Sequence, residues 1–220
     1  MLTVFLDLDG TLIDPKEGIT SSIQYTLQEL GVADIPTQNE LTWCICPPLH
    51  NSFDVLLGPG ADLHEAMAIY REHYTDEAMY LADVYDGIGD MFDAFHQVDA
   101  RLFVATSKPH VYANELIEHF GIHAHVEQLF GSELDGTNSD KTELLKFALD
   151  ETGADPARSV MIGDRRFDII GARNNDIPSV GALWGYGEPE ELHMVEADAL
   201  AGAPEEVPEI VFDLLRLDIE

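Results

Sequence analysis

Four short apolar runs, each ending in polar residues, constrain the fold of this chain most strongly. The first covers Leu2–Leu6 and leads directly into Asp7. The other three cover residues 102–105, 159–162 and 179–183. Such runs are typical of central strands in a parallel sheet, which are buried on both faces. Helical patterns lie between the runs, at about 110–120, 140–152 and 165–175. Strands that alternate with helices predict an α/β fold, a doubly wound, Rossmann-like parallel sheet.

One long segment, residues 17–82, interrupts this alternation. Its apolar residues recur at helical spacing, as at Ile19, Ile23 and Leu27, and it contains no convincing strand. Glycine and proline residues punctuate it into roughly four helices. We therefore predict an α/β core formed by residues 1–16 and 83–220, with residues 17–82 inserted as an α-helical cap domain.

The charge balance excludes several classes of partner. The chain has 42 acidic residues against 11 basic ones, for a formal net charge of -31. Such a charge repels nucleic acid and anionic membrane surfaces, so we expect neither as a partner. No stretch approaches the ~20 apolar residues that span a bilayer. The acidity itself is typical of a solvated surface adapted for solubility, including in a salt-rich cytoplasm.

The two cysteines, Cys44 and Cys46, are separated by one residue. That spacing is poor for a mutual disulfide, and structural zinc normally takes four ligands at wider spacings. We expect both cysteines to be small, half-buried residues in a reduced compartment, and therefore expect a cytoplasmic protein. We expect this protein to be a monomer or a homodimer.

Chemically active side chains follow the predicted strands at their carboxyl ends. Asp7 and Asp9 follow the first run, Thr106 the second and Asp164 the third. Ligands of open α/β sheets bind at this edge, so these side chains are expected to meet. Asp168 lies one helical turn beyond Asp164 and faces the same site. Carboxylate and carbonyl oxygens suit Mg²⁺, so we predict a magnesium site formed by Asp7, Asp9, Asp164 and Asp168.

Lys141 is the most informative basic residue. It lies in the first turn of a predicted helix, where the helix dipole disfavours positive charge by ~0.3 to 1 kcal/mol. The chain has only four lysines, and three of them, Lys16, Lys108 and Lys141, fall in or beside strand-end loops. This placement indicates that Lys141 binds an anion.

Together these residues resemble the haloacid dehalogenase-like hydrolases. Asp7-Leu8-Asp9-Gly10-Thr11-Leu12 is similar to the first motif of that family, Thr106 to the second and Lys141 to the third. Gly163-Asp164-Arg165-Arg166-Phe167-Asp168 resembles the fourth, in its GDxxxD form. The helical insert and Trp184-Gly185-Tyr186-Gly187 look like the phosphoglycolate phosphatase branch. Cys46 stands where that branch often has glycine, and Ser107 where asparagine is common.

The resemblance implies a role for each matching residue. Asp7 is the expected nucleophile, which forms an aspartyl-phosphate, and Asp9 the general acid and base. Thr106, Lys141 and Mg²⁺ are expected to neutralise charge on the transferring oxygens. Residues expected to bind the phosphate or the rest of the substrate are Gly10, Ser107, Lys108 and Arg71.

The resemblance also limits the chemistry. Asp9 and the absence of lysine from 17 to 84 argue against dehalogenases and phosphonatases, and a single cap arginine, Arg71, argues against sugar-phosphate mutases. The expected substrate is a small phosphorylated metabolite. Arg71 suits the carboxylate of phosphoglycolate, whereas Trp43 and Phe53 suit a nucleobase. We therefore expect phosphoglycolate phosphatase-like activity, with 5'-nucleotidase activity as the open alternative.

Three other functions fit less well. A pyrophosphatase of the same family and a non-catalytic binding protein are weaker alternatives, the second because every catalytic position is filled. A phosphorylation-controlled receiver module would also use a phosphorylated aspartate on a doubly wound sheet. It would be shorter, would lack the helical insert and would carry that aspartate on a later strand.

Overall fold

A computed structural model describes residues 1–47 and 49–216. The chain divides into two compact units. The core unit comprises Met1–Ile13 and Val84–Glu220, and the helical unit comprises Asp14–Asp83. The boundaries predicted from the sequence, after residue 16 and before residue 83, lie within a few residues of this division. At the division, β2 (Ile13–Asp14) and β3 (Asp83–Val84) pair as a two-stranded sheet.

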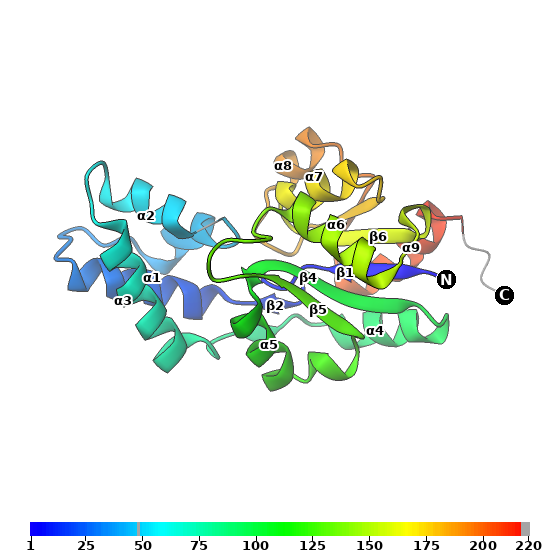
Figure 1. Ribbon diagram of the computed structural model, residues 1–220, viewed down its shortest axis with the longest axis horizontal. Coiled ribbons are helices and arrows are strands. Elements are labelled where there is room, and N and C mark those ends of the chain that lie inside the picture. The colour runs from blue at the N-terminus through cyan, green and yellow to red at the C-terminus, as the bar shows by residue number, and fades with distance from the viewer. Residues whose placement is uncertain (48, 217–220) are drawn as a thin grey trace. The chain divides into compact units, whose positions relative to one another are not determined.

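A six-stranded sheet forms the centre of the core unit, in the order β5-β4-β1-β6-β7-β8 (Figure 1). The strands are β1 (Thr3–Leu6), β4 (Arg101–Pro109), β5 (Gln128–Ser132), β6 (Ser159–Gly163), β7 (Ser179–Ala182) and β8 (Ala199–Ala201). All neighbouring strands pair in parallel. β1 lies between β4 and β6, so its carboxyl end is at the centre of the sheet. The predicted α/β fold class is confirmed.

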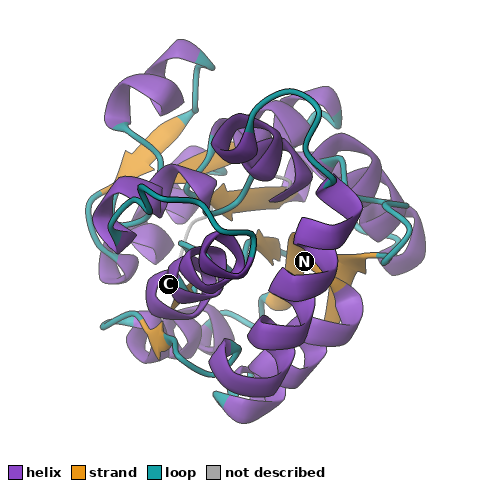
Figure 2. Ribbon diagram, turned by 90° about the vertical axis from the view of Figure 1, so that its left-hand side faces the viewer, coloured by secondary structure: helices purple, strands orange, loops and turns teal. Residues whose placement is uncertain are grey.

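Helices flank this sheet, and Figure 2 distinguishes the orange strands from the purple helices. They are α4 (Ile88–Gln97), α5 (His110–His119), α6 (Lys141–Thr152), α7 (Arg166–Asn174), α8 (Pro189–Met194) and α9 (Val207–Leu214). In Figure 1, α6 and α7 lie on one side of the sheet, and α4 and α5 on the other. Asp140 is the N-cap of α6, because its Oδ1 accepts hydrogen bonds from the amides of Thr142 and Glu143. The position of Lys141 is therefore determined by a capped helix start.

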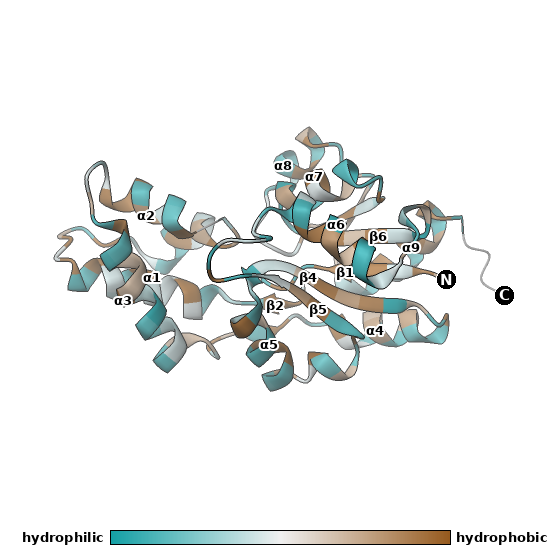
Figure 3. Cartoon of the chain, viewed as in Figure 1, coloured by the Kyte–Doolittle hydropathy of each residue, from teal (hydrophilic) through white to brown (hydrophobic). Residues whose placement is uncertain are grey.

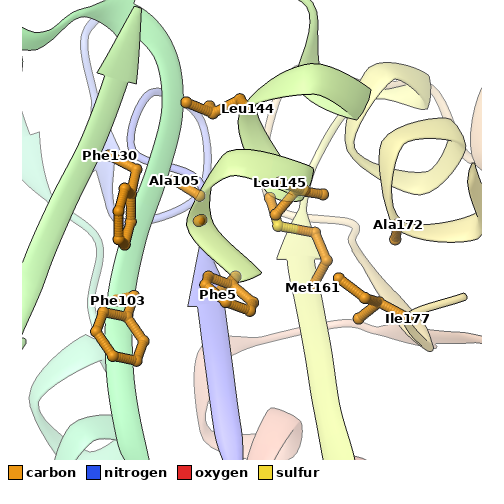
Figure 4. Close-up of a cluster of buried hydrophobic side chains, with 10 residues drawn as sticks. Phe5, Phe103, Ala105, Phe130, Leu144, Leu145, Met161, Ala172 and Ile177 are labelled. Atoms are coloured by element: carbon orange, nitrogen blue, oxygen red, sulfur yellow. The ribbon is translucent and has the colours of Figure 1, made fainter. Parts of the chain in front are cut away.

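A cluster of fully buried apolar side chains fixes the strands that carry the site (Figure 4). Phe5 of β1 stacks on Phe103 of β4 with ring centroids 5.6 Å apart, and Met161 of β6 lies in the same cluster. Leu144 and Leu145 of α6 cover these side chains. Burying each such side chain contributes roughly 1.5 to 3 kcal/mol, so this cluster holds α6 firmly on the sheet, over β4 and β5. The colours of Figure 3 show the same distribution, with brown apolar strands and mixed helices.

The helical unit contains helices and turns between its two connecting strands. These are α1 (Lys16–Glu29), a 3₁₀ helix (Gln38–Cys44), α2 (Leu49–Leu57), α3 (Leu63–His73) and a π-helical turn (Tyr74–Ala78). The rings of Phe53, Tyr70 and Tyr74 pack together in its interior. Cys46 has a φ of 78°, a backbone conformation that favours glycine. The backbone at Cys46 thus fits the glycine that the family resemblance led us to expect there.

Among the described residues, no helix combines the length and the apolar character needed to cross a membrane.

Candidate active site

Asp7 occupies the centre of the candidate site because it directly follows β1. Its amide donates to the carbonyl of Ile162 at 2.9 Å, so the backbone still follows the sheet at this point. Its carboxylate oxygen Oδ1 accepts the amide of Leu8 at 2.8 Å. The side chain is buried, with the residue 6% exposed. Asp7 is thus a held carboxylate at the carboxyl edge of a parallel sheet.

Three buried carboxylates gather at this edge. Asp7, Asp164 and Asp168 each offer an oxygen, and these oxygens lie within 4.8 Å of one another. Asp164 follows β6, and Asp168 lies in the first turn of α7. Burial, together with the charges of Asp168 and Asp7, raises the pKa of Asp164 well above its ordinary value. Burial also raises the pKa of Asp168 to about 6, although Lys141 acts in the opposite direction.

Lys141 joins this cluster from the start of α6. Its Nζ lies 3.0 Å from Asp7 Oδ1 and 2.7 Å from Asp168 Oδ1, and it donates to the carbonyl of Ala105 at 2.8 Å. Burial by itself lowers the pKa of Lys141, but the charges of Asp168 and Asp7 outweigh it and raise the pKa. The ammonium group therefore stays charged. When all three carboxylates are ionised, they and the ammonium group leave the cluster with two negative charges.

That charge and those ligands fit a divalent cation. Three carboxylates within a few ångströms repel one another in a buried site unless a cation compensates them. Hard oxygen ligands of this kind suit Mg²⁺, which is bound through one or two carboxylates together with water and substrate phosphate. The residues that would hold it are Asp7, Asp164 and Asp168.

Asp9 does not share this cluster through its side chain. Its Oδ2 pairs with Lys108 Nζ at 2.8 Å, and both side chains are largely buried. Burial raises the pKa of Asp9, with Lys108 acting in the opposite direction. The binding of phosphate by Lys108 and the contribution of Asp9 to the metal site both stay predictions.

The other predicted phosphate-binding residues have structural partners of their own. The Thr106 hydroxyl accepts the amide of Lys108 at 3.2 Å, and the Ser107 carbonyl accepts the Ser132 hydroxyl at 2.8 Å. The Gly10 amide donates to the carbonyl of Ile13 at 2.8 Å. Thr106 is the last buried residue of β4, and Ser107 follows it in the same strand; both come directly after Ala105, whose carbonyl Lys141 contacts.

Arg71 belongs to the helical unit, on the exposed side of α3. Lys16, which the sequence grouped with the site lysines, lies in α1 of the same unit. Its Nζ donates to Asn39 Oδ1 at 2.7 Å. The predicted contact of Arg71 with substrate stays a prediction.

A loop after β7, residues 183–187, holds Asp164 and was not assigned this role from the sequence. The amide of Tyr186 donates to Asp164 Oδ2 at 2.7 Å, and the Trp184 indole donates to the carbonyl of Thr11 at 3.0 Å. A Cβ at Gly185 or Gly187 would overlap atoms of Asp164. Glycine is required here because backbone and carboxylate approach so closely. The Gly-x-Gly spacing was the available signal.

Gly10 meets the same constraint from the other side. Its φ is +81°, and a Cβ there would overlap the carboxylate of Asp164. The turn after Asp9 therefore contacts Asp164 directly, and a side chain at position 10 would displace a metal-site carboxylate.

Magnesium should stabilise this protein in a pH-dependent way. A carboxyl group whose pKa is higher in the folded than in the unfolded chain costs stability as pH rises, because the folded form holds its proton longer. For Asp168 that loss runs from about pH 4, the ordinary range, to about pH 6. A cation competes with these protons. We therefore expect Mg²⁺ to raise the melting temperature clearly at about pH 8 and little at about pH 5. Thermal denaturation with Mg²⁺ and with EDTA measures this, and an equal shift at both values would contradict it.

These features define a class of protein. A parallel sheet that presents an aspartate, a buried lysine and a triplet of carboxylates at its carboxyl edge is suited to divalent-metal-dependent hydrolysis of phosphate esters.

Comparison with known proteins identifies the family. Residues 4–182 match the haloacid dehalogenase-like hydrolase family. The chain therefore belongs to the haloacid dehalogenase-like hydrolases. A solved structure described as a predicted phosphatase from Clostridium acetobutylicum is similar over 96% of this chain and 98% of that one, with 32% identity and a TM-score of 0.90.

Three curated relatives carry different names. A 5'-nucleotidase of Pseudomonas aeruginosa is 41% identical over 190 residues, 86% of each chain. The tyrosine-protein kinase PtkA of Mycobacterium tuberculosis is 36% identical over 187 residues, 85% of this chain and 64% of that protein. A phosphoglycolate phosphatase of Agrobacterium fabrum is 28% identical over 218 residues, 96% of this chain and 88% of that protein. The family and the phosphatase names among its relatives make this chain a phosphatase.

Proposed function

We propose that this protein is a magnesium-dependent phosphatase that hydrolyses a small phosphomonoester through an aspartyl-phosphate on Asp7. The observation that carries the proposal is the arrangement of Asp7, whose Oδ1 is held by Lys141 and by the amide of Leu8. Because Oδ1 is held in this way, Oδ2 is the oxygen that we assign to attack.

In the first step, Asp7 Oδ2 attacks phosphorus and the bond from phosphorus to the ester oxygen breaks. The leaving alkoxide takes a proton from Asp9. Asp9 lies two residues after the nucleophile and has a pKa raised by burial, which favours the protonated form that this step needs. The products are an alcohol and the aspartyl-phosphate.

In the second step, water attacks the phosphorus of the aspartyl-phosphate and Asp9 takes its proton. The bond between Asp7 and phosphorus breaks, which returns the carboxylate and releases inorganic phosphate. General acid and base assistance of this kind contributes ~10² to 10⁴ in rate.

Charge neutralisation supports both steps. Lys141 balances the charge of Asp7 and Asp168 and presents its ammonium group beside the nucleophile. Bound Mg²⁺ supplies further neutralisation of the phosphate oxygens, and Asp7, Asp164 and Asp168 would hold it.

For the substrate, we favour a nucleoside 5'-monophosphate over phosphoglycolate. The 5'-nucleotidase relative is 41% identical, and the phosphoglycolate phosphatase relative 28%. Charge supports the same order. Phosphoglycolate carries a carboxylate in addition to its phosphate, and a protein with a net charge of -31 disfavours that extra negative charge. A nucleoside is neutral. Lys141 and Lys108, the lysines of the site, already pair with aspartates.

A substrate panel tests this choice. We expect kcat/KM for AMP and other nucleoside 5'-monophosphates to exceed that for phosphoglycolate by about tenfold or more, which corresponds to ~1.4 kcal/mol of transition-state binding. The measurement is phosphate release with Mg²⁺ present, repeated at low and high salt. Phosphoglycolate as the better substrate at both salt concentrations would reverse the order. No turnover with any phosphomonoester would refute the phosphatase itself.

A further inference from the structure

A salt bridge behind the carboxylate cluster has no part in the chemistry described above. Arg165, between the two metal-site aspartates of the fourth motif, pairs with Glu191 of α8. Arg165 Nε lies 3.0 Å from Glu191 Oε1, and Arg165 Nη2 lies 3.3 Å from Oε2. The amide of Arg166 also donates to Oε1, at 2.9 Å. Glu191 thus holds two consecutive residues through three N–H groups.

The pair is sheltered from solvent, which makes its geometry well defined. The side chains of Arg165 and Glu191 are 9% and 17% exposed. A bidentate pair between arginine and a carboxylate is planar and directional, so it fixes orientation as well as charge. By comparison, the pair between Arg173 and Glu196 is at 3.7 Å, with side chains 52% and 85% exposed. Pairs of the exposed kind contribute little.

The segment that Glu191 holds is the one that orients Asp168. The amide of Arg165 donates to Asp168 Oδ2 at 3.1 Å, while Lys141 contacts Oδ1 at 2.7 Å. Both oxygens of Asp168 therefore have a polar neighbour, and the neighbour of Oδ2 is the backbone amide of Arg165. A continuous series of contacts therefore leads from Glu191 through Arg165 to Asp168.

Glu191 also neutralises the positive charge of Arg165. Arg165 directly follows Asp164, and its positive charge acts on Asp164 in the folded protein. Without Glu191, the guanidinium charge that already acts on Asp164 would be unpaired by α8 and would compete with a cation for that carboxylate. The pair with Glu191 directs the guanidinium toward α8.

We propose that Glu191 is a positioning residue that sets the magnesium affinity of the site, by holding Arg165 away from the carboxylate cluster and fixing the amide that orients Asp168. The inference rests on the proposed magnesium-dependent function. It assigns Glu191 no contact with substrate or metal, so its effect falls on metal binding more than on the rate of the metal-saturated enzyme.

The test is a comparison of Mg²⁺ titrations. We expect Glu191→Gln to weaken Mg²⁺ binding about tenfold, at the lower end of the effects of outer-shell partners of metal ligands. Binding is measured directly by calorimetry on the substrate-free protein. Phosphate release is then measured against Mg²⁺ concentration, where kcat at saturating Mg²⁺ should stay within about threefold of wild type while the half-saturating concentration rises.

Two controls separate this role from a change in net charge or in folding. Glu190→Gln removes the same charge from the neighbouring exposed position of α8 and should leave Mg²⁺ affinity unchanged. The double variant Glu191→Gln with Arg165→Gln tests the route, since the two effects should be strongly non-additive if Glu191 acts through Arg165. Melting temperatures measured in EDTA identify any variant that fails to fold.

The outcomes are distinct. Unchanged Mg²⁺ affinity in a folded Glu191→Gln protein overturns the inference and leaves the phosphatase proposal standing. A fall in kcat at saturating Mg²⁺ with unchanged affinity also overturns it. If the wild-type protein binds no Mg²⁺, the proposed magnesium dependence fails and this inference fails with it.

Discussion

Replacing Asp7 with asparagine is expected to lower magnesium-dependent phosphate release by at least about 10⁴-fold, because an amide oxygen is a far weaker nucleophile than a carboxylate. The substitution keeps the size of the side chain, and the amide can still accept the hydrogen bond that Oδ1 accepts from Leu8. The backbone position should therefore persist. Initial rates with p-nitrophenyl phosphate, measured well above the background of the buffer, give the ratio directly.

A chemical signature accompanies this loss. An aspartyl-phosphate is an acyl phosphate, so labelled substrate should leave a protein-bound label that hydroxylamine removes, and Asp7→Asn should leave none. Asp93→Asn, at an exposed position of α4, is the matched control and should keep wild-type turnover. Wild-type turnover in Asp7→Asn would remove Asp7 from its assigned role.

Much of this fold could be predicted because its central strands have a clear sequence pattern. β1, β4, β6 and β7 are buried on both faces, so each requires a nearly continuous apolar run. The edge strands β5 (Gln128–Ser132) and β8 (Ala199–Ala201) escaped prediction. β8 has only three residues, and β5, although buried at four of its five positions, has only two large apolar residues beside Gly131, where a Cβ would overlap the backbone of His110. So few apolar residues in a row leave a weaker pattern than the runs of the central strands.

The candidate site followed from one rule and was incomplete for a physical reason. Side chains at the carboxyl ends of parallel strands meet, and the structure brings Asp7 and Asp164 together there, while Lys141 joins them from the start of α6. Contacts made through backbone amides depend little on residue type, so the Gly-x-Gly spacing was the only signal for the loop whose Tyr186 amide donates to Asp164. Pairing between side chains far apart in the sequence also leaves no local pattern, as with Glu191 and Arg165, which lie 26 positions apart.

Lys141→Met should destabilise the metal-free protein by about 3 to 5 kcal/mol, because it leaves Asp7 and Asp168 buried without their shared counter-charge. Methionine keeps most of the apolar stem, so the packing of Gly171 against the Lys141 side chain largely survives. The cost therefore reports mainly on charge. Turnover should also fall, since the ammonium group beside the nucleophile is lost.

The sign of the pH dependence distinguishes this explanation from a packing defect. Burial raises the pKa of Asp168, and the charge of Lys141 counteracts that rise. Without Lys141 the pKa rises further, and protonation at lower pH relieves the repulsion between the carboxylates. Destabilisation should be clearly smaller at about pH 5 than at about pH 8, whereas lost packing would cost the same at both. Mg²⁺ at about pH 8 should restore part of the stability, because it supplies positive charge to the same oxygens.

Urea unfolding of the Lys141→Met protein at both pH values measures the difference. Lys146→Met, an exposed position on the same helix, should change stability by less than about 0.5 kcal/mol at either pH.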